Sequence, residues 1–399
     1  IQTPFMMNIK EFEKEIPILE LELPKEDTIE AILVSTVKDL DYDSQPNSED
    51  EREIISASKG LSIMEAEWTY RKIIAEKNRI TKNEINLIIK EKEQIIKKSG
   101  VLEYFHPQGD FNEVGGMENL KDWLGKRGKA FSNDAKEFGL VSPKGVMLLG
   151  IPGCGKSLVS KTIANEWELP LLKLDLGSVF GSLVGESEAR MREALSLAEA
   201  ISPSILWIDE IEKGLSGITN GGDGGTSAKV FGTLLTWMQE KKNEVFVIST
   251  ANDISALPPE LLRKGRFDEI FFVDLPSAQE REDIFKIHIE KKKREIGNFD
   301  FNELRNKSVG FSGAEIEEAV NEALFIAYDS NKELDIKHIE EALEKTFPLS
   351  RTMESTIKDL RSWAKVRARF ASNGKSEELP ESKECIPTLP QEKSNPFIN

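Results

Sequence analysis

Residues 150–157 read Gly-Ile-Pro-Gly-Cys-Gly-Lys-Ser and fit the phosphate-binding pattern G-x-x-x-x-G-K-[ST] at every fixed position. In such a loop, backbone N–H groups and the start of the following helix face the phosphate oxygens. Lys156 is expected to reach the β- and γ-phosphates, and Ser157 to ligate Mg²⁺. The pattern predicts a nucleoside triphosphate site with contacts from Pro152, Gly153, Cys154, Gly155, Lys156, Ser157 and Leu158.

Two carboxylates end an apolar run that follows the phosphate loop. Ile205–Ile208 has the composition of a buried strand, and Asp209 and Glu210 come directly after it. At the end of a neighbouring strand, Asp209 would hold the Mg²⁺ shell and Glu210 would orient or deprotonate the attacking water. Strands often end in acidic residues, so the prediction depends on the preceding phosphate loop.

The next apolar strand ends near Asn252, whose amide could hydrogen-bond the γ-phosphate or the attacking water. Arg263 and Arg266 follow at short range. Two arginines three residues apart are ordinarily solvated surface. After this asparagine, however, they could stabilise the charge that develops on a transferring phosphoryl group. If a neighbouring subunit supplies them, hydrolysis would depend on assembly.

Five short apolar runs, separated by helical patterns, would position these residues. Such continuous runs are typical of a parallel sheet covered on both faces. They are Val146–Leu149, Leu171–Leu174, Ile205–Ile208, Val245–Ile248 and Ile270–Val273. Beyond Pro276 the pattern is helical only. It predicts helices over Ser277–Glu290, Ala314–Tyr328, Asp335–Lys345 and Leu360–Phe370. Residues 41–53 are expected to form an acidic loop, and residues 371–399 a disordered tail.

Composition excludes several classes of protein. The 399 residues carry a net charge of −17, whereas a general nucleic-acid binder presents a basic surface. No apolar run is long enough to predict a membrane span. The three histidines lack the spacing of metal ligands, and the two cysteines, Cys154 and Cys385, are not expected to form a disulfide.

The chain also contains a candidate internal repeat. Residues 16–24 resemble residues 269–276, since each ends in Leu-Pro, and residues 60–67 resemble 310–317 at nearly the same offset. The alternative is two ordinary amphipathic helical segments. Residues 80–85 also parallel residues 334–339. Because these three places agree in order, we predict a duplication, in which residues 1–106 are the last strand and helical lid of a degenerate module.

Together, the phosphate loop, Ile205–Glu210, Asn252 and Arg263–Asp268 resemble the AAA family of ATPases in order and spacing, across roughly residues 111–347. The resemblance implies that Val114 and Gly115 lie beside the adenine. It also implies that Gly313 and Ala314, in a helical lid, contact the nucleotide.

The family's fold is an α/β P-loop domain with a five-stranded parallel sheet, followed by an all-helical lid. We therefore expect the ATP-binding subdomain at 107–276, the lid at 277–350 and a terminal helix at 351–370. Several stretches, including residues 155–157, 163–167 and 263–272, resemble more narrowly the AAA proteins encoded in plastid and cyanobacterial genomes. That group is similar in carrying a degenerate ATPase-like half before its AAA module. It implies a cytoplasmic location, or the plastid stroma in an alga.

The family further implies Mg²⁺-dependent ATP hydrolysis in a homo-oligomeric ring, usually of six subunits. Asn252 would then be the first sensor, and Arg263 and Arg266 would act on the ATP of a neighbouring copy. Residues 181–188 correspond to the pore loop, with Leu183 where protein-threading members usually have an aromatic residue. Two hypotheses stay open: an ATPase that remodels an unknown protein partner, and a slowly hydrolysing scaffold or switch. Neither predicts nucleic acid or a membrane as partner.

Overall fold

The computed structural model describes residues 23–40, 47–106, 109–180, 186–215, 224–263 and 265–374. Within these residues no helix is long and apolar enough to cross a membrane. The chain divides into two units. Unit 1 runs to Val273 and also includes Trp363–Asn373, and unit 2 comprises Asp274–Ser362 and the residues from Gly374 onward.

Unit 1 contains a sheet of seven strands in the order β1-β3-β4-β5-β2-β6-β7. The five predicted strands form its centre and are parallel to one another, which confirms the predicted α/β architecture. They are β2 (Gly145–Gly150), β3 (Leu171–Leu174), β4 (Ser204–Ile208), β5 (Val245–Ala251) and β6 (Glu269–Val273).

Each edge of the sheet carries one strand that the sequence did not predict. β1 (Leu102–Phe105) pairs antiparallel with β3, and β7 (Arg369–Phe370) pairs parallel with β6. The predicted helix over Leu360–Phe370 is therefore wrong at its end. The helix α17 (Glu354–Arg367) ends early, and the next residues pair with β6 instead.

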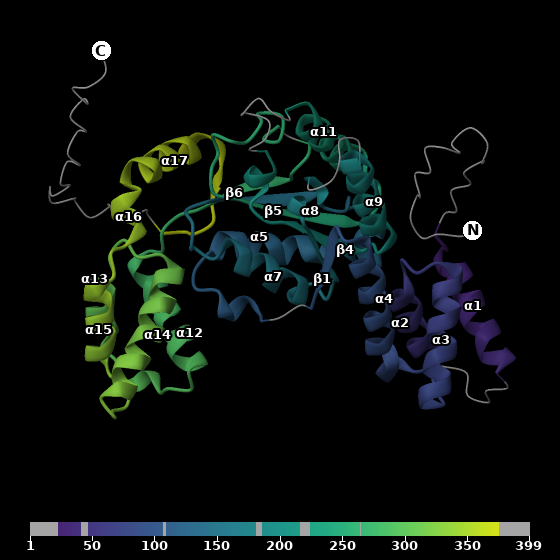
Figure 1. Ribbon diagram of the computed structural model, residues 1–399, viewed down its shortest axis with the longest axis horizontal. Coiled ribbons are helices and arrows are strands. Elements are labelled where there is room, and N and C mark those ends of the chain that lie inside the picture. The colour runs from purple at the N-terminus through teal and green to yellow at the C-terminus, as the bar shows by residue number, and fades with distance from the viewer. Residues whose placement is uncertain are drawn as a thin grey trace, which may run out of the picture. The chain divides into compact units, whose positions relative to one another are not determined.

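Helices cover both faces of the sheet. α5 (Glu118–Gly128) and α7 (Lys156–Glu166) lie on one face, and α9 (Glu186–Ala200) and α11 (Gly224–Glu240) on the other (Figure 1). The described part of unit 1 also contains the short helices α6 (Asn133–Glu137) and α8 (Leu176–Phe180).

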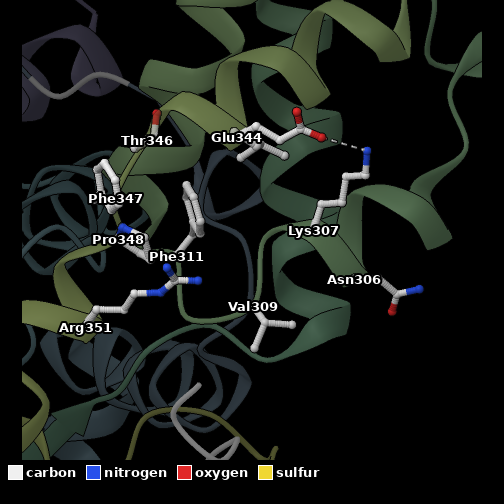
Figure 2. Close-up of a pocket in the computed structure, with 10 residues that line it drawn as sticks. Asn306, Lys307, Val309, Phe311, Glu344, Thr346, Phe347, Pro348 and Arg351 are labelled. Carbon is white, nitrogen blue, oxygen red and sulfur yellow. Dashed lines mark hydrogen bonds and ion pairs between the residues drawn. The ribbon is translucent and has the colours of Figure 1, made fainter. Parts of the chain in front are cut away.

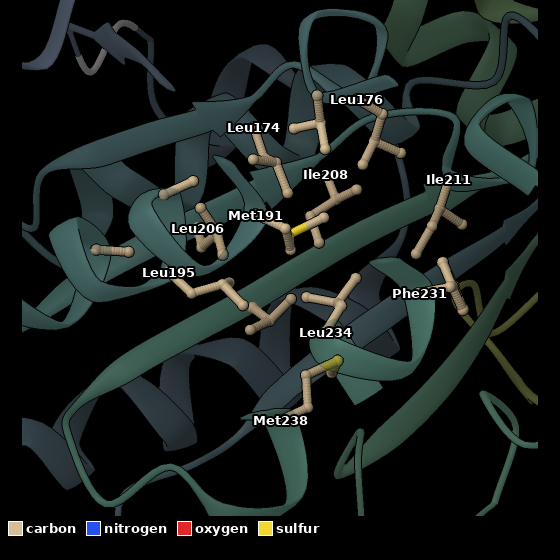
Figure 3. Close-up of a cluster of buried hydrophobic side chains, with 14 of the residues drawn as sticks. Leu174, Leu176, Met191, Leu195, Leu206, Ile208, Ile211, Phe231, Leu234 and Met238 are labelled. Atoms are coloured by element: carbon tan, nitrogen blue, oxygen red, sulfur yellow. The ribbon is translucent and has the colours of Figure 1, made fainter. Parts of the chain in front are cut away.

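The core on the α9 and α11 face is drawn in Figure 3. Met191 and Leu195 of α9 and Leu234 of α11 pack against Leu206 and Ile208 of β4. On the opposite face, aromatic rings contact the sheet edge to face. Because both faces are covered, the strands are apolar at nearly every position, as their continuous runs predicted.

In the described residues before β1, unit 1 contains four α-helices with their own apolar cluster. They are α1 (Glu26–Asp39), α2 (Ser48–Ser58), α3 (Ile63–Lys77) and α4 (Ile85–Ser99). The predicted acidic loop over residues 41–53 is wrong from Ser48, because α2 begins there. The side chain of Asn47 accepts the N–H of Asp50 at 2.8 Å and so caps that helix. Residues 41–46 lie outside the described part of the chain.

Unit 2 is helical, as predicted, and has a separate core. Its helices are α12 (Ala278–Lys291), α13 (Phe301–Lys307), α14 (Gly313–Asp329), α15 (Ile336–Lys345) and α16 (Leu349–Thr352), and it includes the start of α17. A pocket of about 300 Å³ lies in this unit, with Phe311 and Phe347 beside the charged Lys307 and Arg351 (Figure 2).

α3, the third helix of unit 1, and α14, the third helix of unit 2, begin with the same kind of capping box. Ser62 donates its N–H to Glu65 Oε2 at 2.8 Å, and the N–H of Glu65 returns to Ser62 Oγ at 3.4 Å. Ser312 and Glu315 repeat this pair of bonds at 2.7 and 3.4 Å. Both boxes satisfy N–H groups that a helix start leaves without partners.

The residues that flank these two helices also match. Gly60 and Gly310 precede the boxes in left-handed conformation, with φ of 87° and 80°. Asn78 and Asn331, shortly after the helices, are left-handed as well, with φ of 52° and 54°. These matched ends agree with the predicted duplication, which stays a prediction because α12 begins with the same capping box at Ser277 and Glu280. Most of the strand-like residues 16–24, which belong to the same prediction, lie outside the described residues.

Candidate nucleotide-binding site

The phosphate loop begins where β2 meets the end of β6. A Cβ atom at Gly150 would lie 2.0 Å from the carbonyl oxygen of Val273, so no side chain fits. The next residue, Ile151, donates its N–H to the same oxygen at 3.1 Å. Glycine is required at position 150 because the backbones of the loop and the last central strand touch.

The loop turns into α7 at Gly155, which is left-handed with φ of 85°. The Met117 side chain approaches this glycine, so a Cβ there would lie 3.1 Å from the methionine methyl. Cys154 is buried, and its thiol lies 3.7 Å from the carbonyl oxygen of Pro152. Leu158 lies in the first turn of α7 and is partly exposed. The loop therefore has the strand–turn–helix form that phosphate binding needs.

Lys156 is folded back onto the loop. Its Nζ donates to the carbonyl oxygens of Gly150 and Ile151 at 2.9 and 2.7 Å, and its side chain is buried. Burial lowers the pKa of this lysine to about 8, although the nearby carboxylates partly oppose the shift. The ammonium is thus held among loop carbonyls, where phosphate oxygens would be stronger partners.

Ser157 and Asp209 are brought together from α7 and the end of β4. Ser157 Oγ donates to Asp209 Oδ1 at 2.9 Å, and Thr250 Oγ1 donates to the same oxygen at 2.6 Å. A hydroxyl beside a carboxylate is a donor set of hard oxygen atoms, which suits Mg²⁺. The two residues predicted as Mg²⁺ ligands therefore fit the ion in chemistry and in proximity.

Glu210 and Asn252 also meet, across the ends of β4 and β5. Asn252 Nδ2 donates to Glu210 Oε1 at 3.1 Å, and Lys213 forms an ion pair with the other carboxylate oxygen. Glu210 is left-handed, with φ of 48°, and its N–H donates to Thr250 Oγ1 at 2.9 Å. Such a conformation is costly for a residue with a side chain and persists where surrounding bonds fix it.

Two residues of this cluster were not predicted. Thr250 bridges Asp209 and Glu210, and Glu212 accepts the backbone N–H of Asn252 at 3.0 Å. Burial raises the pKa of Glu212, whereas the Asn252 N–H lowers it in part. The sequence carried a signal for each, namely a hydroxyl residue near the end of β5 and a further acid after Glu210.

The segment that contains Val114 and Gly115 follows a turn that contacts α7. Val114 is buried, Gly115 is half-buried, and Lys121 Nζ donates to the Val114 carbonyl oxygen at 2.5 Å. The 3₁₀ turn just before them, Phe111–Glu113, contacts α7. Their role beside the adenine stays a prediction.

The structure does not join the two arginines to the catalytic cluster. Arg263 is exposed and its backbone N–H donates to the carbonyl oxygen of Glu260 at 3.3 Å, while within the described residues its guanidinium makes no hydrogen bond or ion pair. Arg266 donates to the carbonyl oxygen of Glu260. Asp268 fixes the end of the segment that carries the two arginines, because its carboxylate accepts the N–H groups of Lys144 and Gly145 at 2.7 and 3.1 Å. The predicted action on a neighbouring subunit is therefore not tested within one chain.

Two predictions fall elsewhere in the chain. Gly313 and Ala314 begin α14 in unit 2, directly after the cap Ser312, and their contact with nucleotide stays a prediction. Leu183 of the predicted pore loop lies outside the described residues.

Comparison with protein families gives two matches. Residues 146–275 match the ATPase family associated with various cellular activities (AAA). Residues 27–99 match the second domain of SpoVK-like AAA ATPases, which covers the four helices α1–α4.

Individual relatives agree with these matches. The chain is 46% identical over 359 residues to the AAA domain-containing protein ycf46 of Guillardia theta, covering 90% of this chain and 71% of the relative. It is also 46% identical over 375 residues to the ycf46 protein of Pyropia yezoensis, covering 93% and 75%. The ATP-dependent zinc metalloprotease FtsH of Karelsulcia muelleri is 35% identical over 242 residues, which is 59% of this chain and 39% of that protein.

Proposed function

Because the chain belongs to the AAA family of ATPases, among the ycf46 AAA domain-containing proteins, we propose that it binds Mg²⁺-ATP and hydrolyses it as an oligomer to remodel a protein partner. The observation that carries the proposal is the convergence of three strand ends. β2 leads into the phosphate loop, β4 presents Asp209 and Glu210, and β5 presents Asn252, and hydrogen bonds join these residues.

In this proposal each residue has one task. Lys156 exchanges its two carbonyl partners for oxygens of the β- and γ-phosphates. Ser157 and Asp209 hold Mg²⁺, which supplies positive charge against the phosphate oxygens. Glu210 orients the attacking water and accepts its proton, while Asn252 places the γ-phosphate or that water.

The pairing of Glu210 with Lys213 and Asn252 fits a resting state. Each carboxylate oxygen has one partner, so the attacking water competes with Asn252 and Lys213 for the carboxylate. An exposed ion pair contributes only about 0–1 kcal/mol, so bound nucleotide could displace Lys213 at small cost.

Assembly forms the second part of the proposal. Arg263 is exposed and could reach the nucleotide of a neighbouring copy, in a ring that we propose to be hexameric. We place the protein in the cytoplasm, or in the plastid stroma, and its partner is an unidentified protein. No nucleic acid or membrane is part of the proposal.

Single-residue variants test the catalytic assignment. Glu210→Gln keeps an oxygen that can accept from Asn252, and its own backbone N–H, but removes the base. ATP should therefore bind normally while turnover falls about 100-fold or more. Lys156→Ala is the matched control and should lose ATP binding as well. Turnover of the Glu210→Gln protein equal to that of the wild type would contradict the role of Glu210.

A second candidate function is a slowly hydrolysing, nucleotide-dependent scaffold. It is favoured by the two interactions of the Glu210 carboxylate, with Asn252 and Lys213, and by Leu183 in the predicted pore loop. The two functions differ in measurable ways. A remodelling ATPase turns over faster as protein concentration rises and rings form. A scaffold turns over slowly at every concentration but binds its partner differently with ATP and with ADP.

We also propose that α1–α4 are the lid of a degenerate ATPase-like module. The SpoVK-like match over residues 27–99 and the paired capping boxes support this assignment. At the start of α3, Ile63 and Met64 occupy the places that Gly313 and Ala314 occupy in α14. Two bulky side chains there would obstruct a nucleotide, so we expect one bound ATP per chain.

A further inference from the structure

Glu212 lies in the 3₁₀ turn Ile211–Leu215, directly after β4 and the two carboxylates. Its side chain is only 9% exposed, unlike an ordinary solvated acid in a turn. One oxygen accepts the backbone N–H of Asn252 at 3.0 Å. The other oxygen is buried and has no hydrogen-bond partner among the described residues.

The turn after β4 holds Asn252 at two points. Glu212 binds its backbone N–H, and Glu210 binds its side-chain amide at 3.1 Å. Asn252 is the first residue after β5, so its backbone is no longer fixed by the sheet. Without the bond to Glu212, the carboxamide would keep its partner but lose the anchor that sets its position.

We propose that Glu212 is a positioning residue for hydrolysis, which fixes the backbone of Asn252 so that its carboxamide stays aligned with Glu210 and the γ-phosphate. The inference rests on the proposed ATPase function and adds a residue that acts through Asn252. Glu212 itself touches neither the nucleotide nor the water.

The burial of Glu212 indicates that the length of its side chain matters more than its charge. Burial raises the pKa of this carboxylate, and the charge of Glu210 acts in the same direction, whereas the backbone N–H groups of Asn252 and of Glu212 itself, and the charge of Lys156, act against it. Glutamine supplies the same carbonyl acceptor at the same length without charge. Aspartate keeps the charge but withdraws the acceptor by one carbon–carbon bond, about 1.5 Å.

The two substitutions therefore separate the effect of side-chain length from the effect of charge. Glu212→Asp should lower kcat about 10- to 100-fold, as expected for misplacement of a catalytic contact by about 1 Å. KM for ATP and affinity for ADP should change less than about twofold, because the phosphate loop is untouched. Glu212→Gln should turn over at least about ten times faster than Glu212→Asp. Glu240→Asp, at the exposed end of α11, controls for the shortening itself.

Hydrogen exchange at the Asn252 amide, resolved by mass spectrometry with fragmentation, gives a readout that needs no activity. Glu212→Asp should speed this exchange at least about tenfold, and Glu212→Gln should not. Equal turnover of the two variants, a loss confined to ADP affinity, or equal exchange at Asn252 would overturn the inference. Absence of turnover in the wild type would contradict the proposed function instead, and hydrogen exchange alone would then decide whether Glu212 anchors Asn252.

Discussion

Thr250 offers the sharpest test of how the catalytic cluster is held together. Its hydroxyl donates to Asp209 Oδ1 at 2.6 Å and accepts the N–H of Glu210 at 2.9 Å, and the residue is 1% exposed. Thr250→Val replaces the hydroxyl by a methyl group of similar size. The change therefore removes both hydrogen bonds and leaves the packing of β5 almost unaltered.

The expected cost follows from the groups that lose their partner. A hydrogen bond to a charged group contributes about 1.5–3 kcal/mol, and a buried N–H left without an acceptor costs about 1–3 kcal/mol. Asp209 and Glu210 are half-buried, so water can replace part of each loss. We therefore expect Thr250→Val to lower the free energy of unfolding by about 2 kcal/mol. Thr250→Ser keeps both bonds and should lose about 1 kcal/mol for its missing methyl group.

Urea unfolding without nucleotide measures these differences, and steady-state hydrolysis measures the effect on the site. Because Thr250 fixes the left-handed backbone of Glu210, the valine variant should also turn over at least about tenfold more slowly than the serine variant. A valine variant as stable and active as the wild type would refute the reasoning. So would a serine variant that loses more than the valine variant.

Three further predictions concern the phosphate loop and the number of sites. The pKa of Lys156 is about 8 in the folded chain against an ordinary value of 10.5, so between these pH values only the unfolded chain keeps the proton. The free energy of unfolding should therefore rise with pH in this window, and Lys156→Met should reduce that rise. Gly150→Ala should prevent stable folding or ATP binding, measured by circular dichroism and calorimetry, because its Cβ would overlap the carbonyl oxygen of Val273. Equilibrium dialysis should give one ATP per chain. Two bound ATP molecules per chain would contradict the proposal that Ile63 and Met64 obstruct a second nucleotide.

The central sheet could be predicted from sequence because each strand is buried on both faces and reads as a continuous apolar run. The edge strands could not. Leu102–Phe105 is short and contains an exposed glutamate, and only its pairing with β3 makes it a strand. Arg369–Phe370 follows a helical pattern, and the free edge of β6 decides its conformation. Both outcomes depend on partners far away in the sequence, which local patterns do not record.

The candidate site likewise has residues that the sequence predicted and residues that it did not. Ser157, Asp209, Glu210 and Asn252 were predicted because their residue types and order suit phosphate chemistry, and hydrogen bonds bring them together. Thr250 was not found, because a threonine near the end of a strand is ordinary until its neighbours are known. The tasks assigned to Arg263 and Arg266 need a second copy of the chain, so the structure of one chain leaves them as predictions.

The pairing of β7 with β6 has a consequence for the order of folding. Phe272 and Phe370 are paired neighbours, yet nearly all described residues of unit 2 lie between them in the chain. Closing a flexible loop of about 100 residues would cost about 4 kcal/mol. Asp274 and Arg361, near the two ends of this segment, form an ion pair at 2.9 Å within unit 2. If unit 2 folds first, this pair already holds the loop ends close, so the sheet acquires its last strand after most of the closure entropy has been lost.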